Sequence, residues 1–122
     1  MTSYYFDSVN GLDTNDGLTT STPKQSYDAY AQGSMTAGDT YYFKRGTTQV
    51  ISTLNTQVKA GSSTTVRTKY KAYGVAQVPY SIWTPPPKGT LNNSYILNAS
   101  GRSYIDFEDM YFDGLTRATY PL

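Results

Sequence analysis

The sequence predicts an all-β fold, and three features of its composition and pattern support this prediction. Thr, Ser, Tyr, Gly and Asn are abundant while helix formers are depleted, which favours strands and turns. Short apolar or alternating segments recur between groups of turn residues. Tyr supplies 13 of the 122 residues, and its amphipathic ring suits half-buried strands and surfaces that contact sugars or proteins. A chain of this length is expected to form one unit.

The N-terminal part is expected to contain a strand, a polar loop and a helix. Residues 3–7 are mostly aromatic and predict a short strand, and residues 8–17 are dense in turn formers. Within residues 26–32, Tyr27 and Tyr30 lie three positions apart on one helical face, and a glycine follows. We therefore predict one helix of about two turns over 26–32.

The middle of the chain predicts further strands. Residues 40–46 form an aromatic segment bounded by glycines, and β character continues at 50–51. Residues 66–74 alternate, which divides this strand into an apolar face and a basic face. The first face carries Val66, Thr68, Tyr70 and Ala72, and the second carries Arg67, Lys69 and Lys71. The prolines at 85–87 cannot join a central ladder, so residues 83–89 are expected to be an excursion or an edge.

The last third of the chain has short strands separated by tight turns, at 95–97, 104–108 and 110–112. This pattern of short strands and tight turns is typical of a solenoid coil. Ile105, Phe107, Met110 and Phe112 are expected to face the interior, whereas Asp106, Glu108 and Tyr111 face solvent. The opposite register would bury two carboxylates without partners.

Composition excludes several classes of function. The net charge is only +1, so the chain has no field that would steer it to nucleic acid or an anionic membrane. No apolar run approaches the roughly 18 residues of a membrane span, and the N-terminus lacks the features of a signal peptide. A soluble protein made in the cytoplasm is expected. With neither Cys nor His, thiolate and imidazole chemistry are absent, and no metal or cofactor is expected.

Two groups of mainly acidic residues are candidate sites. Asp106, Glu108, Asp109 and Asp113 could act as general acid and base or as calcium ligands, although a solvated strand face with turns explains them more simply. Asp13, Asn15 and Asp16 resemble a calcium loop but lack the later bidentate Glu, so a structural turn is favoured. No catalytic or metal-binding residue is assigned.

Five residues are candidates for carbohydrate binding. Arg67, Lys69 and Lys71 form a basic ladder that could meet an acidic capsule, or could simply be a solvated edge that prevents aggregation. Tyr80 and Trp83 could form a platform on which a sugar stacks, or could cover the coil beneath them.

The order of these motifs resembles the entry of right-handed parallel β-helix proteins of the pectate-lyase-like superfamily. Residues 4–11, 13–18 and 21–23 are similar to the first strand and loop of such proteins. The helix, then the segments 37–46, 70–74 and 104–114, follow in the family's order, so the resemblance covers about residues 3–114. Each motif alone is only moderately specific for this superfamily, and the order of the motifs along the chain is more specific.

The resemblance implies an organisation and a function. Residues 1–38 would be an N-terminal strand, loop and capping helix that closes the end of the solenoid, and residues 39–122 its first coils. Family members without a signal peptide are often phage tailspikes, trimers that bind or cut bacterial surface polysaccharide. The resemblance thus implies a receptor-binding protein of the virion tail, a homotrimer that contacts other tail proteins.

Two alternatives remain open at this stage. One is a polysaccharide lyase or hydrolase of the same superfamily, and the other is a non-catalytic structural module of a virion. In each case this segment by itself is expected to have no catalytic activity, because two or three coils do not make a long substrate groove. Depolymerase activity would need residues beyond Leu122 or from a neighbouring subunit.

Overall fold

The computed structural model describes residues 1–50, 58–75, 81–84 and 101–112, and the side chains of all of these except 81–84, 111 and 112. Their regular secondary structure is almost entirely strand, with one short helix, which confirms the all-β prediction. The elements are β1 (Ser3–Phe6), α1 (Tyr27–Tyr30), β2 (Thr40–Lys44), β3 (Thr48–Val50), β4 (Thr68–Tyr73), β5 (Ser81–Thr84), β6 (Ile105–Phe107) and β7 (Met110–Phe112). In the part described, no helix has the length and apolar character to cross a membrane.

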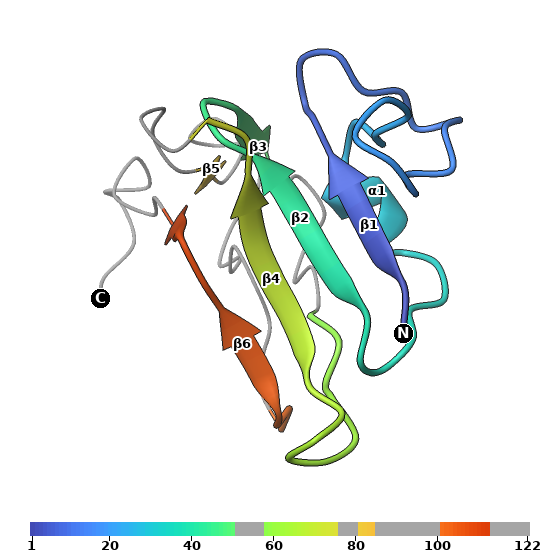
Figure 1. Cartoon of the computed structure of the whole chain (residues 1–122), viewed down its shortest axis with the longest axis vertical. Helices are drawn as coiled ribbons and strands as arrows, with labels where there is room; N and C mark the ends of the chain where they lie inside the picture. Colours follow the sequence, from blue (N-terminus) through green and yellow to red (C-terminus); the bar gives the residue numbers. More distant parts are fainter. Residues whose placement is uncertain (51–57, 76–80, 85–100, 113–122) are drawn as a thin grey trace, which may run out of the picture.

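The strands form two parallel sheets. The first sheet has the order β1-β2-β4-β6 and the second has the order β3-β5-β7. From β2 onward the chain alternates, so that each strand of the first sheet is followed by one of the second. Figure 1 shows the first sheet with its arrows side by side in one direction, and β3 and β5 lying behind it. Neither sheet closes on itself.

Aromatic rings stack along the inner face of the first sheet. Register places Tyr4, Tyr41, Tyr70 and Phe107 one above another on β1, β2, β4 and β6. Successive ring centroids are 5.9, 5.2 and 5.1 Å apart. Alternation at 3–6 and 40–44 sends every second aromatic residue inward, and parallel in-register pairing then superimposes like residues. Together with Phe6, Tyr27, Phe43 and Val58, the rings of Tyr41 and Tyr70 form the buried core.

The predicted faces of 104–110 are confirmed in direction, but the predicted burial of Phe107 is wrong. Ile105 and Met110 pack against the core, and the ring of Phe107 stacks on Tyr70. Phe107 is nevertheless 40% exposed, because β6 is the outermost described strand of its sheet and, among the described strands of that sheet, only β4 lies beside it. The side chains of Tyr111 and Phe112 lie outside the described residues.

The predicted helix is present but shorter than 26–32. α1 begins after Ser26, whose hydroxyl accepts a hydrogen bond from the Ala29 N–H, and its C-cap is Ala31. Tyr27 is fully buried and lies edge-on to Phe6 at 5.7 Å. The buried amide of Gln49 on β3 accepts from the Tyr27 N–H at 3.1 Å and donates to the Gln25 carbonyl at 3.0 Å. The helix therefore covers the end of the second sheet.

A loop covers the free edge of β1, a feature the sequence did not predict. The Tyr5 N–H donates to the Gly17 carbonyl at 2.7 Å, and the Lys24 N–H donates to the Tyr5 carbonyl at 2.9 Å. The Asp7 N–H in turn donates to the Lys24 carbonyl at 2.9 Å. These bonds occupy backbone groups that an exposed edge strand would offer to another chain.

Each described passage from the first sheet to the second contains a residue with positive φ. These residues are Gly46 (φ 78°), Gly74 (φ 110°) and Asp109 (φ 55°). Glycine adopts this conformation freely and Asp tolerates it better than most residues. The corners stack on one another, because the Arg45 N–H donates to the Tyr73 carbonyl at 2.9 Å and the Arg45 guanidinium lies 3.2 Å from the Asp109 carboxylate. The tight turn predicted between 104–108 and 110–112 is confirmed, with Asp109 at its centre.

The expectation for residues 83–89 is wrong at Trp83. β5 is the central strand of the second sheet and ends at Thr84, immediately before the prolines. Because the prolines come after this strand, they remove no ladder hydrogen bond from it. The strand predicted at 95–97 lies outside the described residues.

Candidate functional site

The outward-facing residues of the first sheet, here called the outer face, are polar or charged side chains and tyrosines. Register arranges them in rows across the strands. One row is Ser3, Thr40, Lys69 and Asp106; the next is Tyr5, Tyr42, Lys71 and Glu108; and Lys44 pairs with Tyr73 in the last.

The basic ladder and the acidic residues of 104–109, which the sequence presented as separate candidates, are partners on this face. Arg67 donates to both carboxylate oxygens of Asp106, at 2.8 and 2.7 Å. Lys71 lies 3.1 Å from the Glu108 carboxylate. The hydrogen bonds from Arg67 hold the pKa of Asp106 below its usual value, and the bond to Glu108 raises the pKa of Lys71. The ladder is therefore largely neutralised by β6 and the residue that follows it.

A shallow groove of about 320 Å³ lies at one end of the outer face. Its lining is rich in hydroxyl groups and contains two cations: Met1, Thr2, Ser3, Gly38, Thr40, Thr64, Thr65, Arg67 and Lys69. Arg67 is bound to Asp106, whereas no residue of the described segments forms an ion pair or side-chain hydrogen bond with the Lys69 ammonium. The groove thus combines hydroxyl groups with one lysine ammonium that has no bonded partner among the described residues.

Half-buried tyrosines adjoin the groove on the same face. The rings of Tyr5 and Tyr42 stack at 5.1 Å with an interplanar angle of 11°, and Tyr73 meets Tyr5 edge-on at 5.3 Å. Burial, with the nearby Asp7 carboxylate, raises the pKa of Tyr73 to about 12. Neither these tyrosines nor the groove threonines were predicted from the sequence as site residues. The high tyrosine content was the one available signal.

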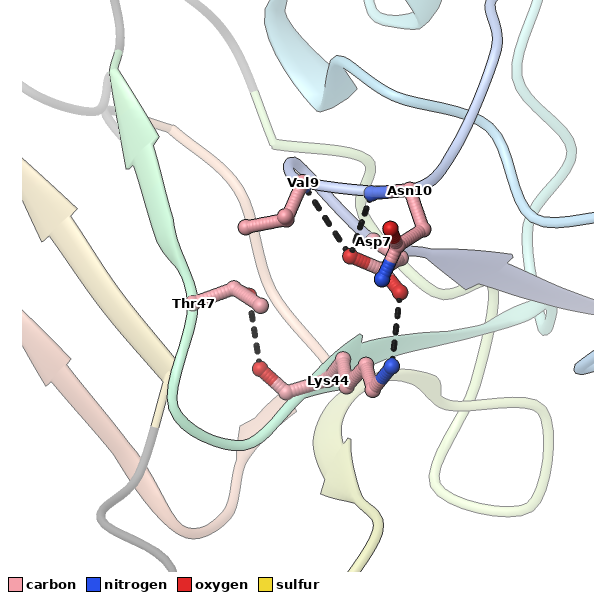
Figure 2. Close-up of polar contacts among 5 residues, drawn as sticks. All are labelled: Asp7, Val9, Asn10, Lys44 and Thr47. Atoms are coloured by element: carbon pink, nitrogen blue, oxygen red, sulfur yellow. Dashed lines mark hydrogen bonds and ion pairs between the residues drawn. The ribbon is translucent and has the colours of Figure 1, made fainter.

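A buried carboxylate anchors the end of this face, as Figure 2 shows. Asp7 is 2% exposed, and its Oδ1 accepts hydrogen bonds from the N–H groups of Val9 at 3.0 Å and Asn10 at 3.1 Å. Lys44 donates to its Oδ2 at 2.9 Å. Burial alone would raise the pKa of Asp7, but the hydrogen bonds from Lys44, Asn10 and Val9 outweigh it and lower the pKa. The Thr47 hydroxyl donates to the Lys44 carbonyl at 2.7 Å and fixes the adjoining corner.

The calcium-like loop is a network of turn hydrogen bonds. Asp13 accepts from the Ser26 N–H at 2.8 Å, and Asp16 accepts from the Leu18 N–H at 3.0 Å. The Asn15 amide donates to the Pro23 carbonyl at 2.8 Å. These bonds confirm the turn interpretation. Within the described ranges, no group of three or more acidic residues is arranged to hold a metal ion.

The structure brings together only part of the predicted carbohydrate site. Arg67, Lys69 and Lys71 lie on β4 or immediately before it and belong to the first sheet. Trp83 lies on β5 of the second sheet, and Tyr80 lies outside the described residues.

No family model and no curated protein sequence matches the chain. Among solved structures, a protein described as "Rhamnogalacturonan lyase" is similar in fold, with a TM-score of 0.50 and 19% sequence identity. The similarity covers 93% of this chain and 28% of the lyase chain, so this chain spans well under a third of that protein. At this level of identity the likeness concerns the fold alone.

Proposed function

We propose that this chain is the N-terminal part of a right-handed parallel β-helix and that its outer face binds bacterial surface polysaccharide, as in a phage tailspike. The alternation of strands between two parallel sheets supports the coil, since each circuit adds one strand to each sheet. The solved structure of similar fold carries the name of an enzyme that acts on a polysaccharide, which agrees with this role.

The observation that carries the proposal is the groove of the outer face. Ser and Thr hydroxyls both donate and accept hydrogen bonds, and a lysine ammonium donates three, so together they suit the hydroxyl groups of a sugar. A volume of about 320 Å³ lies at the small end of known ligand sites, which span about 300–1,000 Å³. The neighbouring tyrosines offer amphipathic rings beside it.

The described acids favour binding over cleavage. A general acid in glycoside hydrolysis needs a raised pKa, whereas Arg67 lowers the pKa of Asp106. Glu108 is paired with Lys71 as well. A lyase or hydrolase would therefore draw its catalytic groups from other residues. Incubation with a bound polysaccharide should release no new reducing ends or unsaturated sugars.

Binding can be tested by affinity electrophoresis of the purified chain through gels that contain capsular or O-chain polysaccharides. We expect retardation by at least one polysaccharide. Thr64→Trp should weaken it at least tenfold by filling the groove, because Thr64 is exposed and lines it. The matched control is Thr48→Trp, since Thr48 is exposed on β3 of the second sheet and should leave retardation unchanged. Equal loss in both variants, or no retardation by any polysaccharide, contradicts the proposal.

The virion context can be tested separately from binding. Purified particles would be labelled with antibody against this chain and imaged in negative stain. Label at the tail supports the tailspike assignment, and particles without label contradict it. Sedimentation of the intact protein should give the mass of a trimer, and a monomer would argue against trimeric assembly.

A further inference from the structure

We infer that the groove around Lys69 is a subsite for the carboxylate of an acidic sugar unit. This inference rests on the proposed function, and it names the class of sugar that the groove selects. It follows from the pairing of charges on the outer face, where Arg67 and Lys71 are bonded to acidic residues and Lys69 is not.

The nearby carboxylates are already engaged. Asp106 pairs in register with Lys69, yet both of its oxygens accept hydrogen bonds from Arg67. Asp39, at the end of the groove, is 3% exposed, and its Oδ1 accepts from the Thr2 N–H at 2.8 Å. Glu108 lies one row farther along and pairs with Lys71. The Lys69 charge contributes to the lowered pKa of Asp106, but no described acid forms an ion pair or a hydrogen bond with the Lys69 ammonium.

The position of Lys69 is fixed by the backbone. Its N–H donates to the Asp39 carbonyl at 3.0 Å, and in-register pairing places Thr40 beside it on β2 and Ser3 beyond that on β1. On the side of β2 and β1 the Lys69 side chain is flanked by small hydroxyl residues, and Lys69 itself is half-buried. An anion in the groove would meet one ammonium and several hydroxyls at once.

This combination favours a carboxylated sugar over a simple inorganic anion. A carboxylate forms charge-assisted hydrogen bonds with an ammonium, and the hydroxyls of the same sugar ring can pair with Ser3, Thr40 and Thr64. An inorganic anion would leave most of these hydroxyls to water. The groove is open at the surface, which allows neighbouring sugar units to continue along the outer face.

The test compares polygalacturonate, alginate and hyaluronate with their carboxyl-reduced forms, which keep the sugar backbone but lose the charge. Binding of the purified chain would be measured by calorimetry. We expect at least one acidic polymer to bind about tenfold or more tightly than its reduced form, a difference of about 1.4 kcal/mol. The discrimination should weaken with added salt, because the site is open to solvent.

Variants of Lys69 separate charge from shape. Lys69→Met should abolish the discrimination while leaving binding to the reduced polymer intact, and Lys69→Arg should retain most of it. The matched control is Lys59→Met, which removes the same charge outside the groove lining and should change affinity less than twofold. Circular dichroism would confirm that each variant is folded.

The outcomes distinguish this inference from the proposed function. If neutral polysaccharides bind and Thr64→Trp weakens them, but no acidic polymer is preferred, the inference is wrong and the proposed function stands. Equal effects of Lys69→Met and Lys59→Met would also overturn the inference, since they would indicate attraction by net charge alone. If no polysaccharide of either kind binds, both fail.

Discussion

Replacing Asp7 with Asn should destabilise the fold, because the structure uses the negative charge of this buried residue. The carboxylate accepts two backbone N–H bonds and one from Lys44 (Figure 2). Asn can still accept at one oxygen, but its NH₂ group would face the Lys44 ammonium, which also only donates. The bond from Lys44 would be lost and the remaining two weakened.

The size of the effect follows from the number and type of these bonds. A hydrogen bond to a charged group contributes about 1.5–3 kcal/mol to stability. The Lys44 side chain is 41% exposed, so water can solvate its ammonium in the variant and the loss falls toward the lower end. We expect Asp7→Asn to lower the free energy of unfolding by about 2 kcal/mol at pH 7. The matched control, Glu108→Gln, removes a 53% exposed carboxylate and should cost about 0–1 kcal/mol.

The same reasoning fixes the pH dependence. The pKa of Asp7 in the folded protein lies below the ordinary value of 3.8. A carboxyl group whose pKa is lowered on folding adds stability that is fully present above the unfolded pKa and is lost as pH falls through the folded pKa. The difference between the wild-type chain and Asp7→Asn should therefore be constant from neutral pH down to about 5 and should shrink below about 4.

Urea unfolding followed by circular dichroism at several pH values measures both quantities. Parallel data for Glu108→Gln show how much any exposed carboxylate contributes. A difference under about 0.5 kcal/mol at pH 7 would be too small for a buried, charge-assisted network. A difference that persisted unchanged below the folded pKa would show that the charge of Asp7 is not its source.

Three further predictions concern packing and titration. Phe107→Ala should cost roughly 1–2 kcal/mol by urea unfolding, because the ring is 40% exposed, whereas Phe43→Ala should cost about 3–5 kcal/mol; equal costs would contradict the packing described. Arg67→Met should raise the pKa of Asp106, measured by NMR titration, toward its ordinary value, and an unchanged pKa would mean that the Arg67 contact is absent in solution. Burial raises the pKa of Tyr70 to about 12, so its contribution to stability should be full below pH 10 and lost as pH rises through 12. As the pH is raised, tyrosinate absorbance should increase together with the loss of the circular dichroism signal. Ionisation of all tyrosines near pH 10 without unfolding would refute the prediction for Tyr70.

Alternation in the sequence predicted which side chains face inward. In β4, Thr68 and Tyr70 are fully buried while Lys69 and Lys71 face outward, as the period of two requires. The helix at Tyr27 was also found from its spacing, although its length was overestimated. These features are local, and local pattern is what a single sequence records most directly.

The sequence did not show which charges meet. Arg67 and Asp106 are separated by 39 positions, and only the parallel pairing of β4 with β6 brings them together. Treated separately, the basic ladder could be a polyanion site or a solvated edge, and the acids could be catalytic groups or a solvated strand face with turns. Their pairing makes both a polyanion site along the whole ladder and catalysis by these acids less favourable. It leaves Lys69 as the cationic side chain of the groove that has no bonded partner among the described residues.

The sequence by itself determined the all-β class, the two faces of its clearest strands and the location of the helix, because these depend on residues within a few positions of one another. Only the tertiary structure decided the register between strands, the exposure of Phe107 and the groove beside Lys69. Each of these depends on segments that are distant in sequence and adjacent in space. Ring stacking fixes how the strands align, and that alignment selects which outward side chains share a row.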